Sequence, residues 1–167
     1  MNNDTTTTET TSGTAPALTL TTTPKKASVW ARLETDPAAE NDGVWVRILE
    51  DEAPDLTLEV RVRSAECLAA RKVNADFLRQ HDNLSGDFKW ILPPELQDEL
   101  DLALCAVLVA DWRGDWTNPD TDEPWPFSTE NLRVACERIR AVRRDILLAA
   151  RARETYRKAA LAAIKGN

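Results

Sequence analysis

Residues that commonly build catalytic or metal sites are scarce in this chain, which holds one histidine, three cysteines and five glycines among 167 residues. His81 lies in a polar turn with no serine or cysteine motif beside it, so neither a catalytic role nor a His/Cys zinc site is supported. The glycines are too scattered for a phosphate-binding loop, and nothing selects two of the many carboxylates as an acid–base pair. We therefore expect no catalytic residue, no cofactor, no metal and no enzymatic activity.

The cysteines are dispersed and form no CxxC pair. Cys67, Cys105 and Cys136 each lie in an apolar helical pattern, where cysteine packs as a small hydrophobic residue. An odd, scattered set of this kind favours a reducing compartment. The N-terminus lacks the basic and apolar regions of a signal peptide, and the longest apolar run, residues 102–110, is far too short to span a membrane. We predict a cytoplasmic protein that does not bind membranes.

Charge is unevenly distributed along the chain. The net charge of −7 argues against nucleic acid as a partner of the whole protein. Residues 131–167 hold ten Lys/Arg and three Asp/Glu, whereas residues 1–130 hold 11 Lys/Arg and 25 Asp/Glu. The basic segment can pair with the acidic body, with another copy or with an acidic partner. We favour a solvated helix face that balances the body, because such pairs are common and individually weak.

The organisation predicted from the sequence has four parts. Residues 1–24 contain eleven threonines and almost no large apolar residue, so we expect a disordered tail; an O-glycosylated stalk is disfavoured because no secretion signal is present. Residues 25–42 form a transition in which Trp30 and Leu33 could dock on the body. Residues 43–142 should form a hairpin with a helical core. Residues 143–167 should form a basic, Ala/Arg-rich helix.

Alternating apolar residues predict two strands, at 43–50 and 56–63, joined by a hairpin loop at 51–55. One face of the second strand should carry Leu56, Leu58, Val60 and Val62. Two strands alone are marginal, so the hairpin must pack on helices or pair with another chain.

Three helical regions are expected. Ser64 is placed to cap a helix over 65–80, with Cys67, Leu68, Arg71, Ala75 and Leu78 near helical spacing. Pro93-Pro94 should start a helix over 94–111, which is apolar on all sides from 102 to 110 and is therefore expected to be the buried central helix. Residues 127–165 then form one long helix or two joined near 143–145. The fold class is α+β, mostly α: a small antiparallel hairpin on a helical bundle behind a disordered N-terminal tail.

The most informative stretch is the joint between the second and third helical regions. We interpret Gly114 as the C-cap of the preceding helix. Phe127, Ser128 and Leu132 occupy the N′, N-cap and N4 positions of a hydrophobic staple, so Ser128 should accept a hydrogen bond from the N–H of Glu130 or Asn131. The joint should therefore set a definite angle between two helices.

Aromatic and acidic residues gather at the same joint. Trp112, Trp116, Trp125 and Phe127 either form an exposed surface for a partner or bury the loop against the helices; we favour burial and keep all four as candidate partner contacts. An EF-hand frame that starts at Asn118 places Glu123 where glycine is needed and Thr129 where glutamate is needed, so a plain solvated loop is favoured over a calcium site. The acidic and amide side chains of this loop are Asp115, Asn118, Asp120, Asp122 and Glu123.

The order of these elements resembles the tail-assembly chaperones of long-tailed bacteriophages and prophages over about residues 43–140. In that family a hairpin exits into a basic helix, a helical segment ends in a Trp-x-Gly turn, and a polar loop leads to a Pro-Phe-Ser helix start. The Thr-rich tail and the Arg/Ala-rich C-terminal helix depart from that pattern. The matching residues are Arg61-Val-Arg-Ser64, Arg71, Lys72, Val109-Ala-Asp-Trp112, Gly114 and Glu123-Pro-Trp-Pro-Phe-Ser-Thr-Glu-Asn-Leu132.

The resemblance implies a non-enzymatic protein of the bacterial host cytoplasm. Such chaperones are thought to coat the helical tape-measure protein, keep it soluble and recruit tail-tube subunits, and they are absent from the finished tail. It thus implies the tape-measure and tail-tube proteins as partners, with a homo-oligomer as a further expectation. Two other classes remain open: a structural virion accessory, and a small regulator that uses its basic C-terminal helix on an acidic partner.

Overall fold

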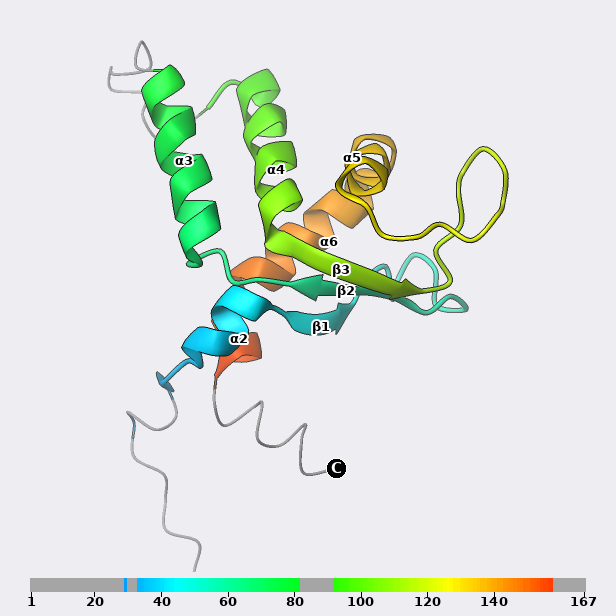
Figure 1. Cartoon of the computed structure of the whole chain (residues 1–167), viewed down its shortest axis with the longest axis horizontal. Coiled ribbons are helices and arrows are strands. Elements are labelled where there is room, and N and C mark those ends of the chain that lie inside the picture. The colour runs from blue at the N-terminus through cyan, green and yellow to red at the C-terminus, as the bar shows by residue number, and fades with distance from the viewer. Residues whose placement is uncertain (1–28, 30–32, 82–91, 158–167) are drawn as a thin grey trace, which may run out of the picture.

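The structure is a computed structural model that describes residues 29, 33–81 and 92–157 (Figure 1). This part of the chain is an α+β fold with more helix than strand, as predicted. Its elements, in chain order, are α2 (Pro37–Asp42), β1 (Val44–Arg47), β2 (Leu58–Val62), α3 (Leu68–Gln80), α4 (Pro94–Leu108), β3 (Val109–Gly114), α5 (Thr129–Arg138), α6 (Arg140–Arg151) and the 3₁₀ helix η2 (Arg153–Tyr156).

The predicted hairpin exists as two strands of a three-stranded antiparallel sheet with the order β1-β2-β3. Val60 of β2 lies opposite Val46 of β1 and Trp112 of β3. Leu58, Val60 and Val62 are buried, as the alternation predicted, whereas Leu56 precedes the strand and is 39% exposed. The central strand therefore gains partners on both sides from the same chain.

The third strand was not predicted. The expected helix over 94–111 ends at Leu108, and the chain continues directly into β3. At the switch, the Arg63 N–H donates to the Leu108 carbonyl at 2.7 Å, and the Arg63 guanidinium donates to the Val107 carbonyl at 2.8 Å. Pairing with β2 thus replaces the hydrogen bonds that a further helical turn would have made.

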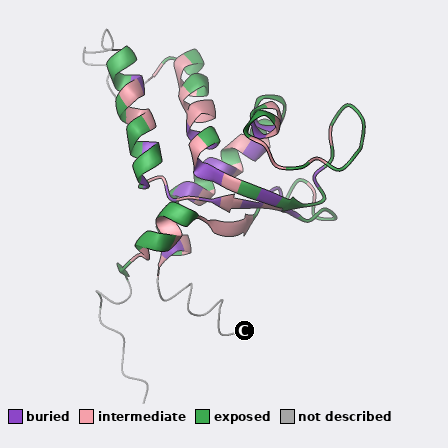
Figure 2. Ribbon diagram, viewed as in Figure 1, coloured by how far each residue is buried: buried purple, intermediate pink, exposed green. Residues whose placement is uncertain are grey.

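Helix α3 begins later and buries other residues than predicted. Its N-cap is Cys67, while Ser64 is buried and its Oγ accepts a hydrogen bond from the Glu66 N–H at 3.1 Å. Of the predicted apolar face, Leu68 is 78% exposed and Leu78 is 58% exposed. Ala70 and Phe77 are buried instead, because α3 contacts α4 along one narrow face (Figure 2).

The C-terminal region contains two helices, and they join at Ile139 rather than near 143–145. Ile139 has extended backbone angles (φ −120°, ψ 94°), and its side chain is 44% exposed. Helix α6 ends at Arg151, so the predicted continuation towards 165 is wrong up to residue 157; residues 158–165 lie outside the described residues. The Tyr156 hydroxyl then donates to the Val62 carbonyl at 3.1 Å, which ties this end of the chain to β2.

Helix α4 is the central helix, as predicted, since it contacts α3, α5 and α6 and leads into β3. Its Leu104, Cys105 and Leu108 are buried in one core with side chains from the sheet, α5 and α6. In Figure 1, α3 and α4 run side by side above the sheet, while the loop between β3 and α5 projects on the right.

Of the predicted docking residues, Leu33 is 54% exposed and Trp30 lies outside the described residues.

Candidate functional site

The four aromatic residues singled out from the sequence meet at the joint between β3 and α5. The rings of Trp112 and Trp116 are stacked, with centroids 4.4 Å apart and planes 10° apart. The ring of Trp125 lies 5.4 Å from that of Trp112 in a tilted arrangement, and the ring of Phe127 meets Trp112 edge-on at 5.5 Å. Trp112 is therefore the centre of one aromatic cluster, which we name the aromatic joint: Trp112, Trp116, Trp125 and Phe127.

Polar atoms of the aromatic joint are used within the joint or by the sheet. The Trp112 Nε1–H donates to the Trp125 carbonyl at 2.9 Å, and the Trp125 N–H donates to the Trp116 carbonyl at 2.9 Å. The Trp116 Nε1–H points to the Glu59 carbonyl of β2 at 3.4 Å. These bonds close the loop back on itself and fix the indole orientations.

Exposure separates two roles within the aromatic joint. Trp112 and Trp116 are 6% and 7% exposed, so they are part of the core and offer little surface to a partner. Trp125 and Phe127 are half-buried and pack against the same core. Structural packing is thus the main role of this cluster, and only the outer edges of Trp125 and Phe127 are available for contact.

Gly114 ends strand β3, so its predicted role as a helix C-cap is wrong. Its φ of +102° is a backbone conformation that favours glycine, and a Cβ there would lie 1.8 Å from the Thr57 carbonyl oxygen. Close approach is needed because the Asp115 N–H donates to that carbonyl at 2.9 Å while the Asp115 carboxylate accepts from the Thr57 N–H at 2.7 Å. Glycine is required by the sheet edge, a feature that the helix prediction missed.

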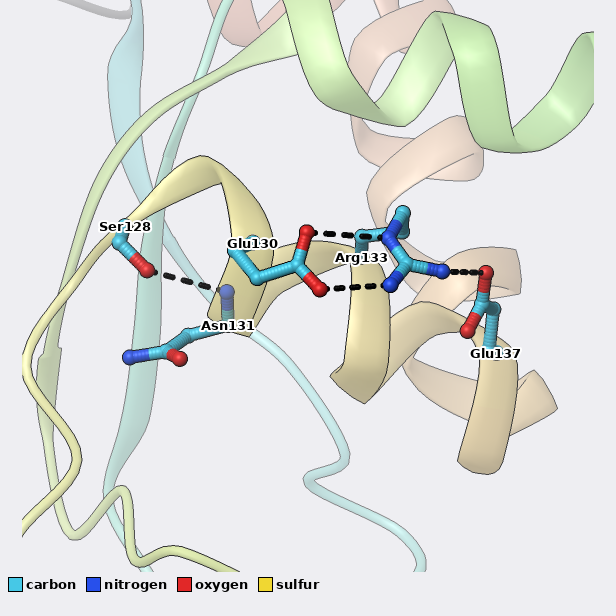
Figure 3. Close-up of polar contacts among 5 residues, drawn as sticks. All are labelled: Ser128, Glu130, Asn131, Arg133 and Glu137. Carbon is cyan, nitrogen blue, oxygen red and sulfur yellow. Dashed lines mark hydrogen bonds and ion pairs between the residues drawn. The ribbon is translucent and has the colours of Figure 1, made fainter.

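Ser128 is the N-cap of α5, as predicted. Its Oγ accepts a hydrogen bond from the Asn131 N–H at 3.0 Å, and its backbone is extended (Figure 3). The side-chain amide of Asn131 donates to the Pro126 carbonyl at 2.8 Å. Leu132, the next residue, is buried. The start of α5 is therefore set by side chains on both sides of the cap.

The outer face of α5 carries an ion-paired triad of Glu130, Arg133 and Glu137 (Figure 3). Arg133 donates to Glu130 through two nitrogens, at 2.5 and 3.1 Å, and to Glu137 at 2.5 Å. The hydrogen bonds from Arg133 hold the pKa of the Glu130 carboxyl below its usual range. All three groups are exposed, so the triad adds little to stability, and its two carboxylates and one guanidinium carry a net charge of −1.

The acidic loop is organised by protein groups. Asp120 receives two hydrogen bonds from Arg138, at 2.8 and 3.0 Å, and these lower the pKa of its carboxyl. The Asn118 side chain accepts from the Asp120 N–H at 2.8 Å, and the Glu123 carbonyl accepts from the Asn118 N–H at 2.8 Å. Across residues 33–81 and 92–157, no three His, Cys, Asp or Glu side chains are grouped closely enough to hold a metal ion.

His81 lies at the C-terminal end of α3 and is half-buried. The His81 ring contacts the Phe77 ring, with centroids 4.4 Å apart. The backbone N–H of His81 donates to the Phe77 carbonyl at 3.1 Å. A helix-terminal packing role accounts for this residue.

Two of the three cysteines meet in the core, a contact that their sequence spacing did not indicate. Cys105 of α4 and Cys136 of α5 are each 1% exposed, and their thiols share a hydrogen bond. That bond, with burial, raises the pKa of the Cys105 thiol. The Cys105 thiol is therefore a protonated packing group at neutral pH; Cys136 and Cys67 are also buried and free of disulfides.

Much of the basic C-terminal segment pairs with the acidic body, in agreement with the favoured interpretation. Arg143 bonds to Asp98 of α4 at 2.7 Å, and Arg144 bonds to Glu52 at 2.5 Å. Two arginines of α6 differ: Arg140 and Arg151 are exposed and make no hydrogen bond or ion pair with any residue that the structure describes. The charge of α6 is thus only partly balanced within the molecule.

Comparison of the chain with protein-family models, curated proteins and solved structures found no match. None of the helices in the described ranges is both long and apolar enough to cross a membrane.

Proposed function

We propose that this protein is a non-enzymatic assembly chaperone that binds helical segments of partner proteins during phage tail morphogenesis. The tape-measure protein and the tail-tube subunits are the proposed partners, and the bacterial host cytoplasm is the proposed site of action. The proposal rests on the resemblance of residues 43–140, whose most specific part is the Trp-x-Gly turn and the Pro-Phe-Ser helix start.

The observation that carries the proposal is the packing of this most specific part into one unit. The aromatic joint connects β3 to α5, Gly114 fits closely against Thr57, and Ser128 caps α5. These residues have structural roles that explain why they occur together at this spacing. A rigid joint of this kind positions helices for partner binding without any catalytic group.

Exposed apolar side chains on the helices supply surface for such binding. Leu68 and Leu78 of α3 are 78% and 58% exposed, and Leu148 of α6 is 58% exposed. Binding of apolar helices needs grooves and adaptable surfaces, and these leucines lie outside the core that stabilises the protein. The proposed partner contacts are therefore on α3 and α6, with Trp125 and Phe127 contributing only their outer edges.

Co-expression with the neighbouring tape-measure and tail-tube proteins, followed by pull-down of the full chain, tests the proposal. We expect the tape-measure protein to be retained, and mass spectrometry of purified particles should not find the chaperone. A Leu68→Ser/Leu78→Ser variant should retain less tape-measure protein. The control is Glu130→Gln, a substitution at an exposed position of α5, which should retain as much tape-measure protein as wild type. Stoichiometric amounts in the particle would make the protein a virion component, and no binding to either partner would overturn the proposal.

A further inference from the structure

Helix α6 lines a hollow of about 320 Å³ whose walls are mainly arginine and leucine. The positions involved recur at intervals of three or four along α6, so they share one side of the helix. Asp101 of α4 is the only carboxylate that lines it. We name this surface the arginine hollow; its α6 residues are Arg140, Arg143, Arg144, Leu147, Leu148 and Arg151.

Positive charge in the arginine hollow is only partly balanced by the residues that the structure describes. Arg143 and Arg144 are paired with Asp98 and Glu52. Arg140 and Arg151, at its two ends, have no partner within the described residues, and the Asp101 carboxylate accepts a hydrogen bond from Gln97 at 2.7 Å. The backbone positions of these two unpaired arginines are eleven residues apart, which is about 16 Å along one helix, and their guanidinium groups attract carboxylates.

Leucine side chains lie between those charges. Leu147 is 7% exposed and belongs to the core, while Leu148 is 58% exposed although it is a large apolar side chain. Small anions or nucleic acid would use the arginines but would leave Leu148 in water. A ligand with carboxylates at its ends and apolar groups between them complements the whole surface.

Neither end of the chain has that composition. Residues 158–167 contain two lysines and no acidic residue, and residues 1–28 contain two acidic and two lysine residues in a Thr-rich sequence. Neither of these two terminal segments therefore supplies the complement of the arginine hollow.

We propose that the arginine hollow docks an acidic amphipathic helix of a partner protein. This inference deepens the proposed function and rests on it only in requiring a protein partner. Carboxylates of the partner would pair with Arg140 and Arg151, and its apolar face would cover Leu148. Affinity would then combine a salt-dependent part with an apolar part that persists at high salt.

A fluorescein-labelled synthetic peptide provides a direct test with the full chain. The probe is an 18-residue helix with leucines on one face and glutamates beside them, and its binding is followed by fluorescence anisotropy. Arg140→Glu/Arg151→Glu should weaken binding about 10-fold or more, because two attractions become repulsions. Leu148→Ser should weaken it about 3-fold, since only part of one apolar side chain is lost.

The charge control is Lys72→Glu/Arg79→Glu on α3, which changes the net charge by the same amount at exposed positions that do not line the hollow; Arg79 also loses its ion pair with Asp76 there. It should leave the affinity within about twofold of wild type, and circular dichroism should show that all variants are folded. Equal weakening by both double variants would show nonspecific charge attraction and overturn the proposal. Equal binding of a glutamate peptide without leucines would overturn it as well.

Two further outcomes would assign the arginine hollow to another occupant. If light scattering shows a dimer that Arg140→Glu/Arg151→Glu separates and the control does not, a second copy occupies the hollow. If a DNA duplex loses affinity in the same pattern while the peptide does not, the surface binds nucleic acid. The tape-measure pull-down is a separate readout: its failure in wild type refutes the proposed function, whereas failure of the peptide test alone refutes only this docking site.

Discussion

The aromatic joint and the arginine hollow are the two regions whose side chains are most unusual for a small domain, and they are built in opposite ways. In the joint, the indole rings of Trp112 and Trp116 stack, both donate hydrogen bonds through Nε1–H, and both side chains are almost fully buried. In the hollow, two guanidinium groups have no partner in the described part of the chain and a leucine is exposed.

This difference shows why a cluster of aromatic residues is a poor guide to a binding surface. A loop between a strand and a helix leaves backbone groups and an apolar edge to cover, and large rings cover them at little cost in conformational entropy. Charged residues are cheap to leave in water, so the proposed docking site rests on the combination of two unpaired arginines with an exposed leucine and not on the charges alone. Substitutions in the two regions should therefore affect different measurements.

The largest effect is expected from Trp112→Ala, which should lower the free energy of unfolding by about 3–5 kcal/mol because it removes the centre of the aromatic joint. Phe127→Ala should cost less, about 1–3 kcal/mol, since that side chain is half-buried. Leu148→Ala in the arginine hollow should cost under about 0.5 kcal/mol. Urea unfolding followed by tryptophan fluorescence and circular dichroism checks the order; a cost for Leu148→Ala similar to that of Trp112→Ala would erase the distinction between the regions.

Gly114→Ala should lower the free energy of unfolding by about 3 kcal/mol, because the added Cβ meets the Thr57 carbonyl and the positive φ is strained for alanine. Gly43→Ala is the matched control: its φ is also positive, at +88°, but the nearest atoms to the added Cβ are at 3.1–3.2 Å. We expect about 1–2 kcal/mol there. Thermal unfolding of both variants measures the difference, and equal costs would mean that the close approach of Gly114 to Thr57 has no energetic weight.

Alkaline pH should destabilise the packing of η2 through Tyr156. Burial raises the pKa of its hydroxyl above the ordinary value, so the folded state retains a proton that the unfolded state loses above about pH 10. The stabilisation is complete below that pH and is lost at about 1.4 kcal/mol per pH unit as pH rises further. Tyr156→Phe should remove this slope relative to wild type in urea titrations between pH 9 and about 11.5; parallel slopes would contradict the assignment.

A smaller effect than those at Trp112 and Gly114 is expected from the cap of α5. Ser128→Ala should cost about 1 kcal/mol, because it removes the acceptor for the Asn131 N–H. Ser128→Asp retains an acceptor at the same position and should stay within about 0.5 kcal/mol of wild type. Amide hydrogen exchange of the first turn of α5 provides a local check, with faster exchange expected only in the alanine variant.

Local chemistry explains which predictions about these regions were confirmed. The Ser128 cap depends on neighbours within three residues, and the alternation of Leu58, Val60 and Val62 depends on which side of one strand is covered. Strand β3 could not be recognised in the same way. Its apolar residues continue the helical pattern of α4, and the hydrogen bonds that make it a strand come from β2, whose paired residues lie 47 to 56 positions earlier.

The exposed leucines and the meeting of Cys105 with Cys136 show the same limit at the level of side chains. Leu68 and Leu78 lie at helical spacing, but in the described part of the chain α3 packs mainly against α4, and these two side chains are exposed. The two cysteines are 31 positions apart, and the packing of α4 on α5 brings their thiols together. Periodicity identifies an apolar stripe; the neighbouring elements decide whether that stripe is covered.

The amino-acid sequence by itself determined the fold class, the hairpin, the capped start of α5, the central place of α4 and the uneven charge along the chain, because each follows from residue type and short-range spacing. Only the tertiary structure decided that the end of the α4 pattern is a strand, that Gly114 serves a sheet edge, that the aromatic joint is largely buried, and that Arg140 and Arg151 remain unpaired around Leu148. Those features depend on contacts between residues far apart in the chain, and such contacts exist only after the elements have packed.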